Sequence, residues 1–455
     1  MSISANIAIA LDEILQQLQA ALEAGDIGAA TALIQGLRPP DQADLMAELA
    51  DSDQTALLPA LPPAESADIL EEMDDAAVTD LLAAMPVEAA ARIIDQMEPD
   101  EAADVLGEME PGQAQSFLDR LEDPDEIRPL LLHPTDSAGG LMTSAFLALR
   151  RRMTAAEAIQ ALREWQPDDD DISFLFVADR VGKLVGLVSL RRIILARPGE
   201  IISDLMDPEV ISVPVGTDQE ACAQIMARYD LLALPVVDSA GVLLGVITID
   251  DVMDVLEEEA TEDFQRMAAT EPLDRPYLDT SVLTITRKRI GWLLLLFLTE
   301  TLTGSVLRHF EGELQATVAL AFFVPLLIGT GGNAGSQTTS TIIRALAVGD
   351  LRLEDALRAF WHELRIGLLL GTGMAIIAYG RALLWGTGSD VALTVSIAIF
   401  CIVVWANGLG SLLPILAARL RIDPTVISGP AMSTVVDATG LFIYFTVAGI
   451  FLATM

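Results

Sequence analysis

The chain has 455 residues, of which 52% are hydrophobic and only 5% aromatic, so it is too apolar for an ordinary soluble protein and long enough for two or three domains. Its net charge of −39 is unevenly placed, because residues 1–286 hold 56 acids and 16 bases whereas residues 287–455 hold 10 acids and 11 bases. An acidic surface of this kind repels nucleic acid and anionic membrane surfaces, and it attracts cations.

Cysteine usage is as expected for a cytoplasmic acidic part. Cys222 and Cys401 lie far apart and form no CxxC, which disfavours disulfides and zinc sites. The N-terminus has no basic segment of the kind that opens a secretory signal, so we expect no cleaved leader.

A twelve-residue repeat fills the first region, which we assign to residues 1–136. Its main apolar column consists of Leu37, Leu49, Leu61, Met73, Met85, Met97, Met109 and Leu121. Helix starts recur in register, as at Glu98-Pro99-Asp100, because proline suits the first helical turn and acids suit the helix dipole. The repeat predicts helices of two turns stacked into a superhelix.

The second region, residues 137–256, contains a longer pattern that occurs twice. Each copy begins with Leu-Met and continues with a short strand, a helix, two strands around a glycine turn and a further helix. This pattern resembles a tandem CBS pair, an α/β unit that commonly dimerises and senses ligands, often adenine nucleotides. The first copy carries an insertion with four aspartates at 168–171, which we interpret as a solvated loop.

The helix that follows the second copy is strongly acidic. Residues 250–263 include eight acids and no base. Like charges four residues apart destabilise a helix by about 0.2–0.5 kcal/mol per pair. Either this helix is simply solvated, or cations bridge it to the acidic superhelix and the CBS pair. A divalent ion held there would couple cytosolic concentration to the region that follows.

The last region, residues 287–455, is predicted to cross a membrane five times. Each candidate offers about the 20 apolar residues that a bilayer requires. The candidates are Ile290–Leu307, Ala316–Leu346, Ile366–Leu384, Val391–Ala418 and Thr425–Thr454. Basic residues flank the first span and the loops after the second and fourth spans, which predicts cytoplasmic N-terminal domains and an outside C-terminus.

Asp437 stands near the middle of the last predicted span, with no basic residue nearby in the sequence. A carboxylate at mid-membrane costs roughly 2.5–3.5 kcal/mol on insertion scales, so it persists where it meets water, a partner or an ion. One alternative is a carboxylate that is hydrogen-bonded within the helix bundle. We favour an ion site, because Mg²⁺ keeps most of its waters and is typically held by one or two carboxylates. Two copies of Asp437 across a dimer axis would supply such a site.

Small and helix-breaking residues surround this acid. They run through the second span at residues 325–337, interrupt the fourth at 407–414 and open the fifth at 428–430. Backbone irregularity within a membrane is tolerated only where it is buried in protein or lines water, so these residues indicate a pore or close helix packing. Glu300 is a further acid in the first span, and the sequence leaves open whether it belongs to the pore or to the interface.

These features resemble the MgtE family of magnesium channels and transporters over nearly the whole chain. The most specific stretches are GGNAGSQ at 331–337, the segment 423–430, VDATG at 436–440 and the acidic helix at 250–263. The resemblance implies a multidomain membrane protein that is not an enzyme. It would comprise an N-terminal α-helical superhelix, a tandem CBS pair, an acidic connecting helix at 257–286 and a five-helix transmembrane domain.

The resemblance also implies a homodimer in the cell membrane that conducts Mg²⁺ and closes when cytosolic Mg²⁺ binds its acidic domains. The implied pore residues are Asp437, Ser433 and Asn333. The implied cytoplasmic sensing residues are Asp100, Asp104, Asp218, Glu220, Asp230, Asp251, Asp254, Glu259, Glu262, Asp263 and Asp423. ATP at the CBS pair is compatible with the family, although no motif in this sequence secures it.

Two other classes of function stay open at this point. One is a transporter for another divalent ion such as Co²⁺, Mn²⁺ or Ni²⁺, or a proton-coupled carrier. The other is a non-conducting membrane sensor, which would leave Asp437 without an explanation. An intramembrane enzyme is disfavoured, because the spans lack an HExxH metal motif.

Overall fold

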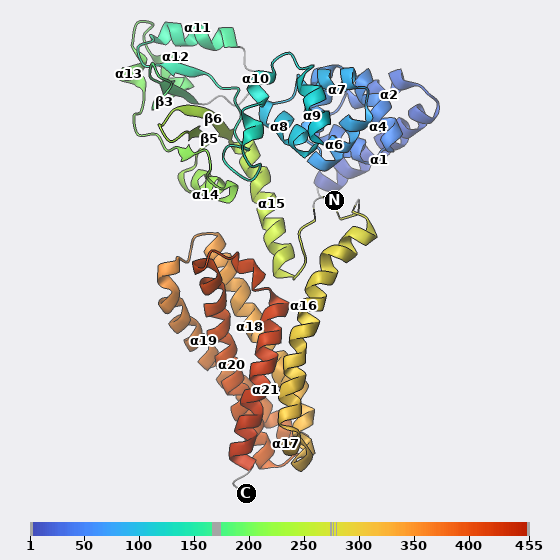
Figure 1. Cartoon of the computed structure of the whole chain (residues 1–455), viewed down its shortest axis with the longest axis vertical. Coiled ribbons are helices and arrows are strands. Elements are labelled where there is room, and N and C mark those ends of the chain that lie inside the picture. Colours follow the sequence, from blue (N-terminus) through green and yellow to red (C-terminus); the bar gives the residue numbers. More distant parts are fainter. Residues whose placement is uncertain (1–2, 166–173, 274, 276, 279, 453–455) are drawn as a thin grey trace. The chain divides into compact units, whose positions relative to one another are not determined.

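The computed structural model describes residues 3–165, 174–273, 275, 277–278 and 280–452, so the four-aspartate run at 168–171 lies outside the described residues. The chain divides into two compact units, Met1–Glu257 and Glu258–Met455 (Figure 1). The expected class of fold is confirmed: a helical superhelix and a CBS pair in the first unit, and five long apolar helices in the second.

The superhelix is built from a long first helix and a series of helices of about two turns. They are α1 (Ile3–Glu23), α2 (Ile27–Ile34), α3 (Pro39–Ala47), α4 (Asp51–Leu57), η1 (Leu58–Ala60), α5 (Pro63–Glu71), α6 (Asp75–Ala84), α7 (Val87–Ile94), α8 (Pro99–Glu108), α9 (Pro111–Leu118), α10 (Pro124–Ile127) and η2 (Leu130–Leu132). The repeat columns are its core: Met85, Met97 and Met109 are all buried. After α1, which packs mainly on α2, the helices pack mainly on their second neighbours in the series, for example α6 on α8, as expected for a stacked repeat.

The CBS pair consists of two three-stranded sheets of identical topology. The first contains β1 (Ala148–Arg150), β2 (Phe174–Ala178) and β3 (Leu184–Ser189), with helices α11 (Ala155–Trp165), α12 (Leu190–Leu195) and α13 (Ile202–Leu205). The second contains β4 (Val213–Pro214), β5 (Ala233–Val237) and β6 (Leu243–Thr248), with helix α14 (Gln219–Tyr229). In each sheet the first strand runs parallel to the second, and the second runs antiparallel to the third.

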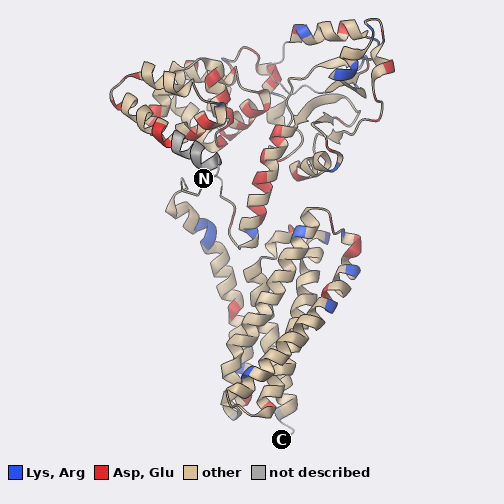
Figure 2. Ribbon diagram, turned by 180° about the vertical axis from the view of Figure 1, so that it is seen from behind, with Lys and Arg blue, Asp and Glu red and all other residues tan. Residues whose placement is uncertain are grey.

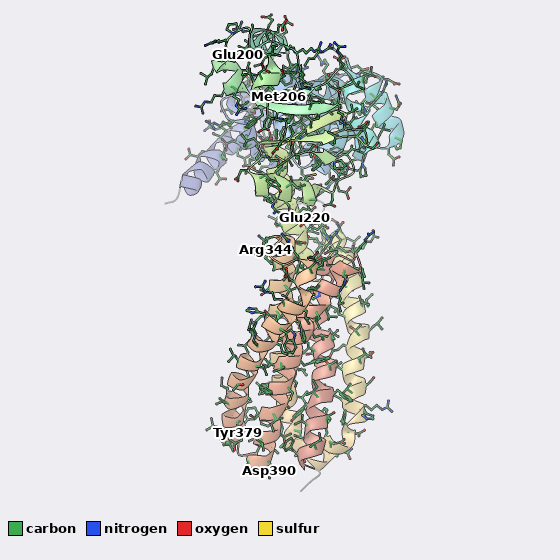
Figure 3. All side chains as sticks on the ribbon, turned by 90° about the vertical axis from the view of Figure 1, so that its left-hand side faces the viewer. Glu200, Met206, Glu220, Arg344, Tyr379 and Asp390 are labelled. Carbon is green, nitrogen blue, oxygen red and sulfur yellow. The ribbon has the colours of Figure 1, made fainter. Side chains whose placement is uncertain are left out.

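The methionine that opens each copy lies against the glycine in the last strand of the other copy. A Cβ on Gly186 would lie 2.5 Å from the sulfur of Met206, and one on Gly245 would lie 2.6 Å from the Cγ of Met142. The second glycine of each turn motif is therefore required because the methionine side chain occupies the space of its Cβ. Figure 3 shows Met206 at this place in the first unit.

The acidic helix α15 (Ile249–Met267) continues directly from β6. It begins eight residues before position 257, where we expected the connecting helix to start, and it ends well before residue 286. Ala269 has a φ of 58°, a left-handed conformation that α-helices do not continue through, which accounts for the stop. In Figure 2 the acidic residues gather on the superhelix and α15, whereas the long helices of the second unit are mostly uncharged.

The second unit is a bundle of long helices joined by short ones. They are α16 (Val282–His309), α17 (Glu311–Ala316), η3 (Val318–Phe323), α18 (Val324–Ala347), η4 (Leu353–Asp355), α19 (Ala356–Leu384), α20 (Ser389–Arg419), η5 (Pro424–Val426) and α21 (Gly429–Leu452). Five helices among the described residues are long and apolar enough to cross a membrane, as predicted. Figure 3 shows Arg344 at one end of this bundle and Tyr379 and Asp390 at the other.

The third span differs from its prediction. We expected it to start at Ile366, but the helical segment begins at Leu353 and α19 at Ala356. The charged residues between these positions hid the helix from a search for apolar runs. As a result Glu363, which we did not single out from the sequence, lies inside a helix and is buried. The predicted end of the last span at Thr454 lies outside the described residues.

The expected interruption of the fourth span is wrong, because α20 runs unbroken through its glycines and through Pro414, and α18 likewise runs unbroken through its glycines. The glycines serve close helix packing instead. A Cβ on Gly410 of α20 would lie 2.8 Å from the carbonyl oxygen of Gly335 in α18. A Cβ on Gly331 would lie 2.6 Å from Ile402 of α20. Small residues let helices approach where lipid offers no hydrophobic driving force.

Gly410→Ala is expected to destabilise the bundle, because the added methyl group meets backbone rather than a side chain that can rotate away. Overpacking of this kind costs about 1–3 kcal/mol. The measurement is the thermal unfolding midpoint of the purified chain in detergent. The matched control is Gly373→Ala on α19, where nothing lies within 4 Å of the added Cβ. A midpoint that does not fall for Gly410→Ala relative to that control would contradict the packing argument.

Candidate functional site

Asp437 lies on α21 at the point where α18 comes closest to it. A Cβ on Gly332 of α18 would lie 3.0 Å from Ser433 Oγ and 3.5 Å from Asp437 Oδ1. Ser433 Oγ is 3.2 Å from the hydroxyl of Ser336, which in turn donates to the carbonyl of Gly429 at 3.0 Å. The approach brings a carboxylate, two hydroxyls and the glycine-rich backbone of α18 into one place.

The charge of Asp437 is not neutralised by a base. Among the ion pairs of the described residues, none involves Asp437. The charged group that acts on it is the carboxylate of Glu300 on α16, which repels it. The structure thus brings Glu300 within electrostatic reach of Asp437, a relation that the sequence left open. Asn333, the third expected pore residue, is exposed on α18.

A second acidic site lies in the first unit, where α8 of the superhelix meets the first turns of α15. Asp100 is 4% exposed, and its Oδ1 has no hydrogen-bond partner. The carboxylate of Asp251 repels it across the contact. Thr248 fixes Asp251, because its backbone N–H and its hydroxyl donate to Asp251 Oδ2 at 3.2 and 2.6 Å. Two carboxylates are therefore held together without a base.

Burial and mutual repulsion raise the pKa values of this cluster. Burial, followed by repulsion from Asp251, raises the pKa of Asp100 well above its ordinary value. Burial, followed by repulsion from Asp75 and Asp251, raises the pKa of Glu101 to about 9. Burial raises the pKa of Asp251 to about 6 in spite of the hydrogen bonds from Thr248. In this arrangement the ionised carboxylates are unfavourable unless a cation joins them.

The same contact extends one turn along α15. Burial raises the pKa of Asp254, and burial together with the charge of Asp254 raises the pKa of Glu72 at the end of α5. Asp104 on α8 adds to the repulsion at Glu101. The expected group of Asp100, Asp104, Asp251 and Asp254 is thus brought together. Sequence reasoning missed Glu72 and Glu101; Glu101 is next to Asp100 in the chain, whereas Glu72 belongs to an earlier repeat and carries no local signal.

The expected CBS residues lie at the two ends of α14. Asp218 is the N-cap, and its Oδ1 accepts from the backbone N–H of Glu220 at 3.0 Å and of Ala221 at 3.4 Å. Asp230 is the C-cap, with a φ of 53°. Helical rise puts roughly 18 Å between these ends, so Asp218 and Asp230 of one chain cannot hold the same ion. Their capping geometry also gives Asp218 and Asp230 a structural role.

A third acidic group lies in the second unit, at the end of α15. Asp263 and Asp423 repel each other, and burial followed by this repulsion raises the pKa of Asp263. Here a base is present: Arg266 Nη1 lies 2.7 Å from Asp423 Oδ2, and Arg266 also pairs with Glu262. Asp423 further accepts from the backbone N–H and the hydroxyl of Thr425, at 2.8 and 2.6 Å. Glu259 adds to the repulsion at Asp263.

No group of three or more Asp, Glu, His or Cys side chains within the described residues is arranged as a ready metal site. The acids meet in pairs instead, and the pairs come from elements that are distant in sequence. Such pairs suit an ion that retains part of its water shell.

Comparisons with known proteins agree with this organisation. Residues 324–447 match the family model described as a divalent cation transporter, MgtE; residues 37–136 match the MgtE intracellular N domain; and residues 138–199 and 202–258 match the CBS domain. The magnesium transporter MgtE of Thermus thermophilus is 42% identical over 327 residues, which is 72% of each chain. That of Bacillus subtilis is 32% identical over 329 residues, again 72% of each chain.

A solved structure of a cytosolic domain is also similar. It is the cytosolic domain of the Mg²⁺ channel MgtE in complex with ATP, and it has a TM-score of 0.50 and 35% sequence identity. The alignment covers 53% of this chain and 99% of that domain.

Glu101→Gln is expected to stabilise the chain when divalent ions are removed. The pKa of Glu101 is raised to about 9 in the folded chain, so at neutral pH this side chain must take up a proton on folding, and glutamine carries no such cost. The midpoint for unfolding of the cytosolic part, measured in EDTA at neutral pH, should rise by about 2–4 °C for each kcal/mol of this cost that is removed, and the gain should disappear below the ordinary pKa of a glutamate. The control is Glu48→Gln, an exposed acid of the same superhelix. Equal midpoints for the two variants would show that the contact is not under electrostatic strain.

Proposed function

This chain belongs to the MgtE family, and we propose from that premise that it conducts Mg²⁺ through the membrane and is closed by Mg²⁺ bound to its acidic cytosolic surfaces. Its relatives are named as magnesium transporters. The observation that carries the proposal is Asp437, an acid in the last span that no base neutralises among the described residues and that faces hydroxyls and glycine backbone.

The conducted ion would keep most of its water in this pore. Mg²⁺ dehydrates reluctantly and is typically bound through one or two carboxylates, with the remaining ligands being water. Asp437 supplies one carboxylate per chain, and the repulsion from Glu300 adds to the local negative potential. In a homodimer, two copies of Asp437 facing the axis would hold one hydrated ion, and Asn333 and Ser433 would be available to its water shell.

The orientation follows from the basic residues. Arg344 lies at the end of the bundle opposite Asp390 (Figure 3), and the loop after α18 carries Arg352 as well. Positive residues favour the cytoplasmic side, so this end would face the cytosol together with the N-terminal unit. With five spans the C-terminus would be outside.

Closure by Mg²⁺ would act through the acid pairs. In the absence of divalent ions, Asp100 can be buried beside Asp251 only against their mutual repulsion or by taking up a proton, and either cost disfavours the contact between α8 and α15. An ion bound between them favours the contact, and it shifts the equilibrium only by its extra affinity for the closed arrangement. Several such pairs along α15 would make the response steep.

The pair at the end of α15 would act in a different way. Arg266 already forms an ion pair with Asp423. Its guanidinium group therefore neutralises that carboxylate, whereas at Asp100 and Asp251 a bound ion would have to do so. Asp263 then remains the acid available to a divalent ion at this point. In the CBS pair, the solved relative with ATP supports the expectation that this chain also takes an adenine nucleotide there.

Asp437→Asn is expected to reduce Mg²⁺ uptake into proteoliposomes at least tenfold, because it removes the charge that would hold the ion. Asp390→Asn is the matched control, as it removes an exposed acid at the end of the same bundle. Uptake that survives in Asp437→Asn with normal folding would place the conducting path elsewhere. Absence of uptake by the native chain, even with internal Mg²⁺ chelated, would favour the non-conducting sensor.

Replacing Asp251 and Asp254 together by Asn is expected to keep the channel open at high internal Mg²⁺, where the native chain closes. The measurement is uptake of Mg²⁺ as a function of the Mg²⁺ concentration on the cytosolic side. Competition by Co²⁺, Mn²⁺ and Ni²⁺, and the response to a proton gradient, would be tested on the same vesicles to separate the rival transport functions. Closure of the double variant at the native concentration would contradict gating through this contact.

A further inference from the structure

Three oxygen atoms from three helices meet inside the membrane unit, away from Asp437. Thr338 Oγ1 of α18 is 3.3 Å from Glu363 Oε2 of α19 and 2.9 Å from Asn407 Oδ1 of α20. Glu363 is 9% exposed, Thr338 5% and Asn407 2%. Helices α19 and α20 pack closely at this point, since a Cβ on Gly367 would lie 3.1 Å from the Cβ of Asn407. The carboxylate thus lies in a closed, polar cluster between packed helices.

The cluster has too few protons for its acceptors. The amide of Asn407 is oriented by its N–H, which donates to the carbonyl of Val403 at 2.8 Å, so its oxygen faces Thr338. The Thr338 hydroxyl has one proton and two acceptors, the amide oxygen of Asn407 and the carboxylate of Glu363. When the hydroxyl donates its proton to one of these two acceptors, the other acceptor faces only a lone pair of the hydroxyl oxygen.

Basic residues do not supply the missing positive charge. Among the ion pairs of the described residues, none includes Glu363. Helix α20 has no charged residue between Asp390 and Arg419, and the one base on α18, Arg344, acts on Asp263. On α19 itself, Arg365 is exposed and donates to the carbonyl of Trp361 in its own helix. A buried charge without a partner is strongly destabilising.

We propose that Glu363, Thr338 and Asn407 form a second cation site that takes one small, dehydrated monovalent ion, Na⁺. One carboxylate matches one positive charge, and three protein oxygens with short spacings suit a small ion. Mg²⁺ is a poor occupant, because it would bring two charges to one carboxylate and keeps several waters for which this tight position has no room. The proposal is independent of which ion crosses at Asp437.

Occupation of this site would join three helices. Thr338 lies six residues after Gly332 on α18, which is about 9 Å along the helix. Since Gly332 approaches Asp437, the bound Na⁺ would hold α18 against α19 and α20 at a short distance from the pore acid. Sodium would therefore stabilise the bundle and set the position of the helix that lines the path.

The test uses the full chain purified in detergent with EDTA. Its thermal midpoint is measured in NaCl, KCl and choline chloride at equal ionic strength, and binding of ²²Na⁺ is measured in parallel. We expect a saturable rise of several degrees with NaCl over choline chloride and one ²²Na⁺ bound per chain. Glu363→Gln, which keeps the shape but not the charge, should lose both effects, whereas Asp390→Asn should keep both.

Thr338→Val serves as a second variant in case Glu363→Gln folds poorly, and it should weaken Na⁺ binding while leaving the carboxylate in place. The proposal is overturned if the native chain shows no difference between NaCl and choline chloride, or if Glu363→Gln and Thr338→Val respond as the native chain does. It is also overturned if acid, rather than Na⁺, stabilises the native chain through Glu363, since the missing charge would then be a proton.

Discussion

Carboxylates that are held together without a base are the constraint on which the rest of this molecule depends. Asp100 and Asp251 are brought into one contact by the packing of α8 on the start of α15, and the orphaned Oδ1 of Asp100 shows that the protein does not satisfy them itself. Apolar burial of the repeat columns stabilises the superhelix enough to impose this contact. A cation bound there would offset this cost, and the proposed response to cation concentration rests on that balance.

In the membrane unit, the acids Asp437 and Glu363 lie beside polar atoms of closely packed helices. Gly332 brings α18 to Ser433 and Asp437, and Gly410 brings the same helix to α20 one to two turns further along. Because glycine leaves no side chain at these crossings, hydroxyls and backbone can reach the acids. The same tight crossings limit how far α18 can shift without strain, since packed interiors yield little.

Periodic parts of the sequence predicted most of the fold, and non-local contacts account for what was missed. The methionine and leucine columns, the paired glycine turns and the apolar runs each encode one element locally, and the structure confirms all three. The sequence left open whether the glycines in the spans mark a pore or close helix packing, because local signals do not reveal that a partner helix fills the space of a missing Cβ. Glu363 was hidden by neighbouring charges, and Arg266 lies just beyond the run of acids that drew attention.

The superhelix has a consequence for how such chains can diversify. Each helix of about two turns packs on near neighbours in the series, so the array is nearly one-dimensional and its ends do not contact each other through a shared core. Because most helices pack on their second neighbour, a duplication or deletion of two repeats, about 24 residues, would preserve this alternation and the interfaces on either side of the change. The domain can therefore lengthen or shorten during evolution while the acids on α8 stay in register with α15, provided that the change occurs before α5.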